Sequence, residues 1–200
     1  MSAARVGTTT RDQVLGRVRS ALAGREGLPH PGALNTDPDG GLDALSSRLR
    51  QNGARVERVE SGAAPGEWIG HLLQRLVPRD ELTVAVGHGV PGRLIPPLPT
   101  APPDQASVGI SLAWGAAAET GTLVLPATEG RRVQLLVPVH VVWLDEGHIH
   151  ARLQDALDSA RKRGMGAALG LHSGPSKSAD IGRTLVTGVH GPGQLVVAVL

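Results

Sequence analysis

Residues 107–125, SVGISLAWGAAAETGTLVL, contain the pattern that decides the fold. Apolar segments at residues 107–112 and 122–125 predict strands, and residues 116–119 predict a short third strand that turns back at a Thr-Gly pair. A loop of glycine, threonine and one carboxylate at the end of a strand presents backbone N–H groups and hydroxyls. Ligands of α/β proteins are usually held in such loops.

Helices and strands alternate at short spacing on both sides of this stretch. Apolar positions at helical spacing predict helices over residues 10–23, 42–49, 68–77, 149–163 and 178–187. Apolar or alternating segments predict further strands over residues 54–59, 82–86, 139–144, 167–171 and 194–200. The alternation predicts an α/β sheet. We expect the strand near the C-terminus to be an exposed edge with which a partner could pair.

A stretch rich in proline and glycine, residues 24–41, separates the first predicted helix from the rest of the chain. We therefore expect two parts. Residues 1–41 would form an N-terminal arm of helix and linker, and residues 42–200 would form one α/β domain. The 200 residues of the chain are enough for such a domain to bury a proper core.

The composition argues against several classes of protein. The formal net charge is +2, the arginines are scattered and aromatic residues make up 2% of the chain, so we expect no nucleic-acid binding. Without cysteine, the chain has no disulfide, no cysteine nucleophile and no cysteine-ligated iron–sulfur cluster of its own, and we expect no cofactor in it. No apolar run approaches the roughly 20 residues that span a bilayer, and residues 1–13 lack the apolar stretch of a secretory signal. We expect a cytoplasmic protein.

Two further patterns are weak indications of a site. Gly87, Gly89 and Gly92 spell GxGxxG after a predicted strand, but the prolines that follow prevent the long helix that a dinucleotide site requires. We interpret the pattern as a glycine turn whose N–H groups could help to bind an anion. His148 and His150 lack a third ligand in the sequence. This favours solvated histidines over a metal site, and we expect no metal.

Glu119, followed by Thr120, Gly121 and Thr122, is the candidate catalytic carboxylate. At a hairpin turn a carboxylate can orient a hydroxyl, act as a base or attack an activated acyl group. The alternative is a structural role, in which Glu119 accepts hydrogen bonds from N–H groups of the turn. The sequence shows no second catalytic partner, which slightly favours the structural role. The three residues after Glu119 are candidates for binding a ligand.

The second candidate loop lies in SGPSKSADI, residues 173–181. Serine or aspartate at the start of a helix caps free N–H groups, and that end attracts anions. Four such residues beside a lysine exceed what a cap requires, so we predict a loop that binds phosphate or carboxylate. Two histidines in loops or at strand ends could face the same cleft or hydrogen-bond to the backbone. These further candidates for ligand binding are Ser173, Gly174, Ser176, Lys177, Ser178, Asp180, His140 and His190.

Four motifs in order along the last half of the chain closely resemble the LutC/YkgG family, the LUD-domain proteins of lactate utilisation. They are AETGTLVL (118–125), LVPVHVVWL (136–144), SGPSKSADI (173–181) and GVHGPGQLVV (188–197). The resemblance runs from about residue 107 to residue 200, and the first hundred residues resemble the family only in layout. Ser178 stands where the family commonly has threonine, which keeps the hydroxyl.

The resemblance implies a fold like that of the NagB/RpiA/CoA-transferase group, an open and mostly parallel α/β sheet with helices on both faces. It also implies a component without a cluster that acts beside iron–sulfur partner proteins in oxidising L-lactate to pyruvate, with a homodimer as a possibility. Two other functions stay open. One is an independent enzyme on a CoA-transferase-like or sugar-phosphate-isomerase-like scaffold with Glu119 as nucleophile or base. The other is a regulatory module that binds a small organic acid or a phosphate-bearing ligand.

Overall fold

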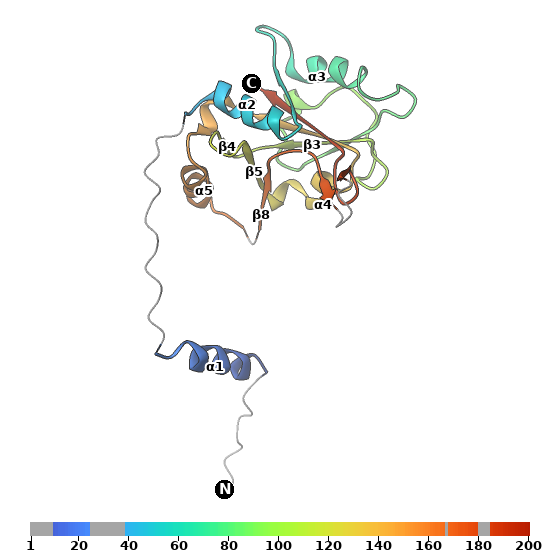
Figure 1. Cartoon of the computed structure of the whole chain (residues 1–200). Helices are drawn as coiled ribbons and strands as arrows, with labels where there is room; N and C mark the ends of the chain where they lie inside the picture. The colour runs from blue at the N-terminus through green and yellow to red at the C-terminus, as the bar shows by residue number, and fades with distance from the viewer. Residues whose placement is uncertain (1–9, 25–38, 167, 180–184) are drawn as a thin grey trace. The chain divides into compact units, whose positions relative to one another are not determined.

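The computed structural model describes residues 10–24, 39–166, 168–179 and 185–200 (Figure 1). Contacts divide the chain into two units, residues 1–36 and 37–200. The described part of the first unit contains helix α1 (Thr10–Leu22), which confirms the helix predicted there. Its apolar residues Val14, Val18 and Leu22 are exposed. The predicted boundary at residue 41 stays a prediction.

A five-stranded sheet forms the centre of the second unit. Its order is β1 (Arg55–Arg58), β11 (Gln194–Val199), β6 (Val139–Leu144), β3 (Val108–Leu112) and β2 (Val84–Val86). All four neighbouring pairs are parallel, which confirms the mostly parallel α/β fold. Strand β6 is buried along its whole length, as expected for an inner strand covered on both faces. Because β11 lies between β1 and β6, the expectation of an edge strand near the C-terminus is wrong.

Helices contact both faces of this main sheet. On one face, α3 (Pro65–Leu73) packs its apolar residues, such as Ile69 and Leu72, into one core with Val141 and Trp143 of β6. On the other face, α2 (Leu42–Gln51) and a second sheet form a separate core. The five-residue helix α4 (Arg131–Leu135) covers β3 there. Figure 1 shows α3 and α4 on opposite sides of the strands.

The second sheet is mixed and was not foreseen as a separate layer. Its order is β7 (Ile149–His150), β4 (Gly115–Ala117), β5 (Thr122–Pro126) and β8 (Leu169–His172). Strands β4 and β5 are antiparallel, which confirms the predicted hairpin. Helix α5 (Leu153–Lys162) covers this sheet, with its alanines packed in one cluster with Ala117 and Val124.

Three predicted helices differ from the structure. The helix predicted over residues 68–77 begins earlier, at Pro65, and ends at Leu73, because proline is favoured in the first turn of a helix. The helix predicted over residues 149–163 begins only at Leu153, because the two residues of β7 pair with β4. The helix predicted over residues 178–187 is wrong: β9 (Lys177–Ala179) and β10 (Leu185–Thr187) form an antiparallel pair. Serine and aspartate favour turns as much as helix starts, so this segment was open to both interpretations. Three short 3-10 helices complete the described elements: η1 (Gly92–Leu94), η2 (Ala127–Glu129) and η3 (Glu146–His148).

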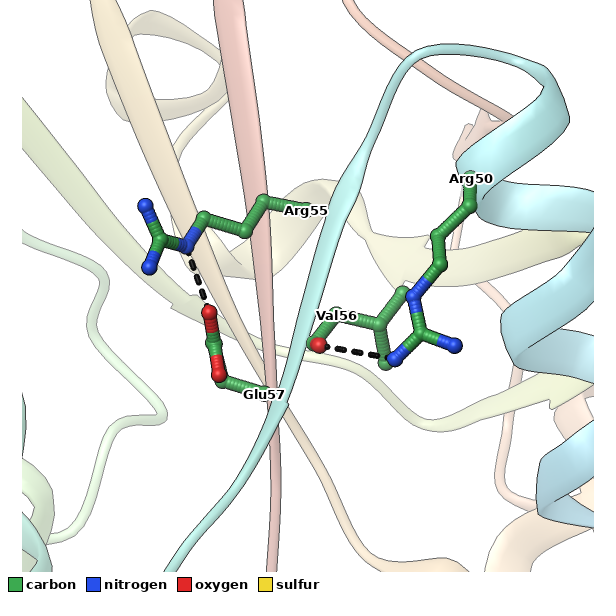
Figure 2. A network of polar contacts seen from close by, with 4 residues as sticks. All are labelled: Arg50, Arg55, Val56 and Glu57. Atoms are coloured by element: carbon green, nitrogen blue, oxygen red, sulfur yellow. Dashed lines mark hydrogen bonds and ion pairs between the residues drawn. The ribbon is translucent and has the colours of Figure 1, made fainter.

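Strand β1 lies at one edge of the main sheet and is surrounded by charged side chains (Figure 2). The Arg50 guanidinium of α2 donates a hydrogen bond to the Val56 carbonyl oxygen at 3.2 Å, and Arg55 Nε lies 2.5 Å from Glu57 Oε1. An occupied backbone acceptor and exposed charges protect an edge strand from pairing with another chain. One backbone acceptor of this edge strand is therefore occupied by a side chain of the same chain.

Candidate functional site

The two loops singled out in the sequence are joined by a chain of hydroxyl groups. Thr120 Oγ1 lies 2.7 Å from Thr122 Oγ1 in the β4–β5 turn. Thr122 Oγ1 in turn lies 2.8 Å from Ser173 Oγ, which follows strand β8. Loops 51 residues apart in the sequence therefore share one hydrogen-bonded line. The two loops are thus in contact, but neither Thr120 nor Thr122 lines the cavity that the second loop forms.

Five of the predicted ligand-binding residues line one cavity of about 180 Å³. Other lining residues include Leu135 of α4, Leu171 and His172 of β8, and Leu195 of β11. The volume is below the range of about 300–1,000 Å³ typical of sites for drug-sized ligands, and it suits a small molecule or several waters. The predicted residues on its wall are His140, Ser173, Gly174, Ser176 and His190.

His140 is the buried polar residue of this cavity, with no exposed surface. Its Nε2 lies 2.9 Å from Ser111 Oγ of β3, and its ring meets the ring of His172 edge to face, with centroids 5.6 Å apart. Its Nδ1 has no hydrogen-bond partner among the described residues. Burial, with a smaller contribution from His172, lowers the pKa of His140 to about 3. The imidazole is therefore neutral at neutral pH, and its Nδ1 is a buried polar atom without a protein partner among the described residues.

The loop after β8 is held in place by the end of helix α2. A Cβ at Gly174 would lie 2.7 Å from the Asn52 carbonyl oxygen, so the loop approaches the helix closely enough to need glycine there. Lys177 Nζ donates to that same oxygen at 2.5 Å. A lysine at this end of a helix compensates its unpaired carbonyl groups. Lys177 is thus bound to α2, and it does not line the cavity.

Backbone hydrogen bonds tie this loop to residues 188–192. The Ser176 N–H donates to the Pro192 carbonyl oxygen at 2.8 Å, and the Gly188 N–H donates to the Ser176 carbonyl oxygen at 2.9 Å. These bonds place the exposed His190 at the mouth of the cavity. Of the other predicted residues, Ser178 lies in β9 away from the cavity wall, and Asp180 lies outside the described residues.

Gly121 serves the turn rather than the cavity wall. Its φ is +65°, and a Cβ there would lie 2.7 Å from Arg48 Cβ of α2. The turn therefore packs tightly against α2, the helix that also holds the loop after β8. A side chain at this position would be strained by both the backbone and the neighbour.

Glu119 caps a helix. Glu119 Oε1 accepts a hydrogen bond at 2.6 Å from the N–H of Leu153, the first residue of α5. The backbone N–H of Glu119 donates to the Ala151 carbonyl oxygen at 3.0 Å. A carboxylate at the N-terminus of a helix satisfies a free donor and interacts favourably with the helix dipole. Glu119 does not line the cavity. The geometry supports the structural alternative for this residue.

The glycine turn after β2 is filled by the protein's own carboxylate. A Cβ at Gly89 would lie 1.9 Å from Glu129 Oε1, and one at Gly87 would lie 2.5 Å from Glu129 Oε2. Glu129 is 4% exposed and accepts from the Leu112 N–H at 3.4 Å. Burial raises its pKa, and backbone hydrogen bonds and His88 oppose this. The space in this turn is therefore occupied by the Glu129 side chain, which the sequence did not indicate.

His148 and His150, near η3, are not part of a metal-binding cluster among the described residues. His148 is part-exposed and lies 3.9 Å from Asp145, while the half-buried His150 belongs to β7. Across residues 10–24, 39–166, 168–179 and 185–200, no three histidine, aspartate or glutamate side chains are grouped closely enough to hold a metal ion.

The cavity lies at an unusual place in the main sheet. His140 is the second residue of β6 and Leu195 the second of β11, so the cavity adjoins the amino ends of these parallel strands. Ligands of open α/β sheets usually bind at the carboxyl ends. Here the cavity lies instead at the carboxyl end of β8, in the second sheet. Sequence reasoning missed His172, whose only signal is its place at the end of a predicted strand and before the serine-rich loop.

The fold and the cavity define an α/β domain with a small polar binding site between two glycine- and serine-rich loops. Comparison with known proteins gives the family. Residues 104–200 match the LUD domain. Lactate utilization protein C of Deinococcus radiodurans is 31% identical over 168 residues, which cover 80% of this chain and 79% of that protein. The chain belongs to the LUD-domain family that includes lactate utilization protein C.

Other relatives match over a shorter stretch. Lactate utilization protein C of Bacillus subtilis is 36% identical over 96 residues, covering 44% of this chain and 40% of that protein. The chain thus spans about two fifths of the length of several relatives that it matches. The crystal structure of a DUF162 family protein from Deinococcus radiodurans has a TM-score of 0.56 and 19% identity, covering 78% of this chain and 94% of that one. This likeness confirms the fold. None of the helices described has the length and apolar character needed to cross a membrane.

Proposed function

We propose that this chain acts in the utilisation of L-lactate and binds a small organic acid in the cavity between residues 173–176 and 190–192. The observation that carries the proposal is the convergence of three of the four family motifs on one cavity. Membership of the LUD-domain family supports lactate as the context, because the relatives are named for it.

The lining of the cavity suits a small hydroxy or keto acid. Ser173 and Ser176 supply hydroxyl groups, and the free ring nitrogen of His140 supplies one further donor or acceptor. Leu135, Leu171 and Leu195 supply apolar contacts for the carbon chain. A few placed polar groups on a mostly apolar wall are the usual composition of a small-molecule site.

In this proposal the chain is the non-redox component, and iron–sulfur partner proteins carry the electrons from L-lactate to pyruvate. The sequence has no cysteine with which to bind a cluster of its own. Location in the cytoplasm and assembly as a homodimer are parts of the same proposal. The alternative of a CoA-transferase-like enzyme needs Glu119 as a nucleophile. The hydrogen bond from the Leu153 N–H to Glu119 favours the structural role instead.

The test combines growth and binding. A strain that lacks this gene and any other lactate dehydrogenase should fail to grow on L-lactate as sole carbon source, and the wild-type gene should restore growth. Ser173→Ala should restore it poorly, whereas His148→Asn, which lies off the cavity, should restore it fully. Sodium L-lactate, sodium pyruvate and inorganic phosphate are titrated into the purified chain by calorimetry. Normal growth without the gene, or no binding of either organic acid, would contradict the proposal.

A further inference from the structure

The cavity that would hold an acid has no permanent charge on its wall. Among its described lining residues there is no aspartate, glutamate, lysine or arginine. Removing a carboxylate from water is costly unless an opposite charge meets it. The groups on the wall that can become positive are the imidazoles of His140, His172 and His190. An opposite charge on this wall to meet an anionic ligand therefore requires a proton on one of them.

His172 is the best placed of the three. His140 has no exposed surface, and His190 is exposed at the mouth, where solvent screens its charge. His172 is half-buried and lines both this cavity and a neighbouring one of about 200 Å³. Burial lowers the pKa of His172, so its ring is neutral in the free protein at neutral pH. A carboxylate placed beside it favours the protonated form.

The amide of Gln134 lies beside the same glycine as the His172 ring. A Cβ at Gly170 would lie 2.8 Å from His172 Nε2 and 2.9 Å from Gln134 Oε1, so both atoms lie over the same glycine. Gln134 Nε2 donates to the Pro126 carbonyl oxygen at 3.0 Å. This bond fixes the position of the amide, whose oxygen is an acceptor beside the same glycine as His172 Nε2. A protonated imidazole has two N–H donors and gains from such an acceptor.

The groups that face His172 are few. The ring of His140 on β6 meets it edge to face, Gln134 and Arg131 on α4 line the neighbouring cavity, and His190 lies across the shared cavity. Arg131 is the permanent charge in this set. Its positive charge would attract an incoming anion.

We infer that the cavity takes up an anionic organic acid together with one proton, and that His172 holds this proton against the bound carboxylate. The inference rests on the proposed function. In the balanced step, the carboxylate, one proton from solvent and neutral His172 give a carboxylate–imidazolium pair, and no covalent bond to carbon changes. His140 stays neutral and hydrogen-bonds the ligand through its free nitrogen.

The experiment is calorimetric titration of sodium L-lactate into the purified full chain at pH 7.5, in PIPES, HEPES and Tris. The slope of the observed enthalpy against the ionisation enthalpy of the buffer gives the number of protons taken up. We expect about one proton and an affinity that falls toward tenfold per pH unit as the pH is raised. His172→Asn should bind more weakly, take up no proton and lose the pH dependence. The remote His148→Asn should keep the proton uptake.

The outcomes separate the two proposals. Binding by the wild-type chain without proton uptake would overturn the inference and leave the site intact. Proton uptake that persists in His172→Asn would overturn the assignment to this residue. No binding of lactate or pyruvate even at pH 5.5 would contradict the proposed function itself. If His172→Asn does not fold, NMR of the wild-type histidine rings decides, because the His172 signals must shift to the protonated form when lactate is added.

Discussion

Removing the Glu119 carboxylate should weaken the start of helix α5 and leave the chemistry of lactate utilisation intact. In Glu119→Ala, the Leu153 N–H loses the oxygen that accepts it at 2.6 Å. Glu119→Gln keeps an oxygen at that position but removes the negative charge. The pair of variants therefore separates the hydrogen bond from the charge.

The size of the effect follows from the contact. Loss of a helix cap costs about 0.5–2 kcal/mol, and a hydrogen bond to a charged acceptor is worth about 1.5–3 kcal/mol. Glu119 is half-buried, and water can reach the freed N–H group, so we expect about 1–2 kcal/mol for Glu119→Ala. In a domain of this size that corresponds to a fall in Tm of about 2–8 °C. Glu119→Gln should lose only the attraction to the helix dipole, about 0.3–1 kcal/mol.

Thermal unfolding followed by circular dichroism measures these shifts. The exposed Glu81→Ala is the matched control and should change the free energy of unfolding by less than about 0.5 kcal/mol. Both Glu119 variants, expressed in the deletion strain, should support growth on L-lactate at moderate temperature. If Glu119→Gln melts like wild type but abolishes growth, the carboxylate takes part in the chemistry and the capping argument is refuted.

Three further predictions concern packing, pH and the hydroxyl chain. Gly109→Ala should lower the free energy of unfolding by about 1–3 kcal/mol, because its Cβ would lie 2.3 Å from a backbone carbonyl oxygen of α4. In urea it should unfold at a lower concentration than Gly92→Ala, whose Cβ meets nothing within 4 Å. The pKa of His140 is lowered from 6.5 to about 3, so its neutral ring stabilises the fold above pH 6.5. This stabilisation is lost, at up to about 1.4 kcal/mol per pH unit, as the pH falls toward 3. A ring that NMR finds protonated at pH 5 would contradict the prediction. Thr122→Val should lower the free energy of unfolding by about 1–2 kcal/mol and weaken lactate binding, because it removes the hydroxyl bonded to Ser173. The exposed Thr128→Val should do neither. Equal stability of the two variants would show that the hydroxyl chain does not stabilise the fold.

The sequence predicts the inner strands well because burial on both faces of the sheet requires a short, continuous apolar segment. Residues 139–144 form a continuous apolar run because β6 is covered on both faces, and the hairpin over 116–125 has its glycine at the turn. The second sheet was not predicted, because its separation from the first depends on which faces pack together. The pairing of β9 with β10 likewise depends on partners outside the local pattern.

The candidate site was found in part for the same reason. Hydroxyls and glycines crowded into two loops are visible as composition, and the structure brings Thr122 and Ser173 together. What composition cannot show is contact at long range. The filling of the Gly87–Gly89 turn by Glu129, and the meeting of His140 with His172, both join segments more than 30 residues apart. For this reason the sequence does not indicate that Glu129 fills the glycine turn or that His172 lies beside His140.

The position of β11 bears on how the domain is made. Residues 194–199 lie between β1 and β6, so until they leave the ribosome the first strand of the main sheet has no neighbour and both apolar cores stay incomplete. The main sheet of this domain therefore cannot be completed before residues 194–199 have been synthesised. Products of interrupted synthesis would expose two unpaired strand edges, which invite aggregation and proteolysis.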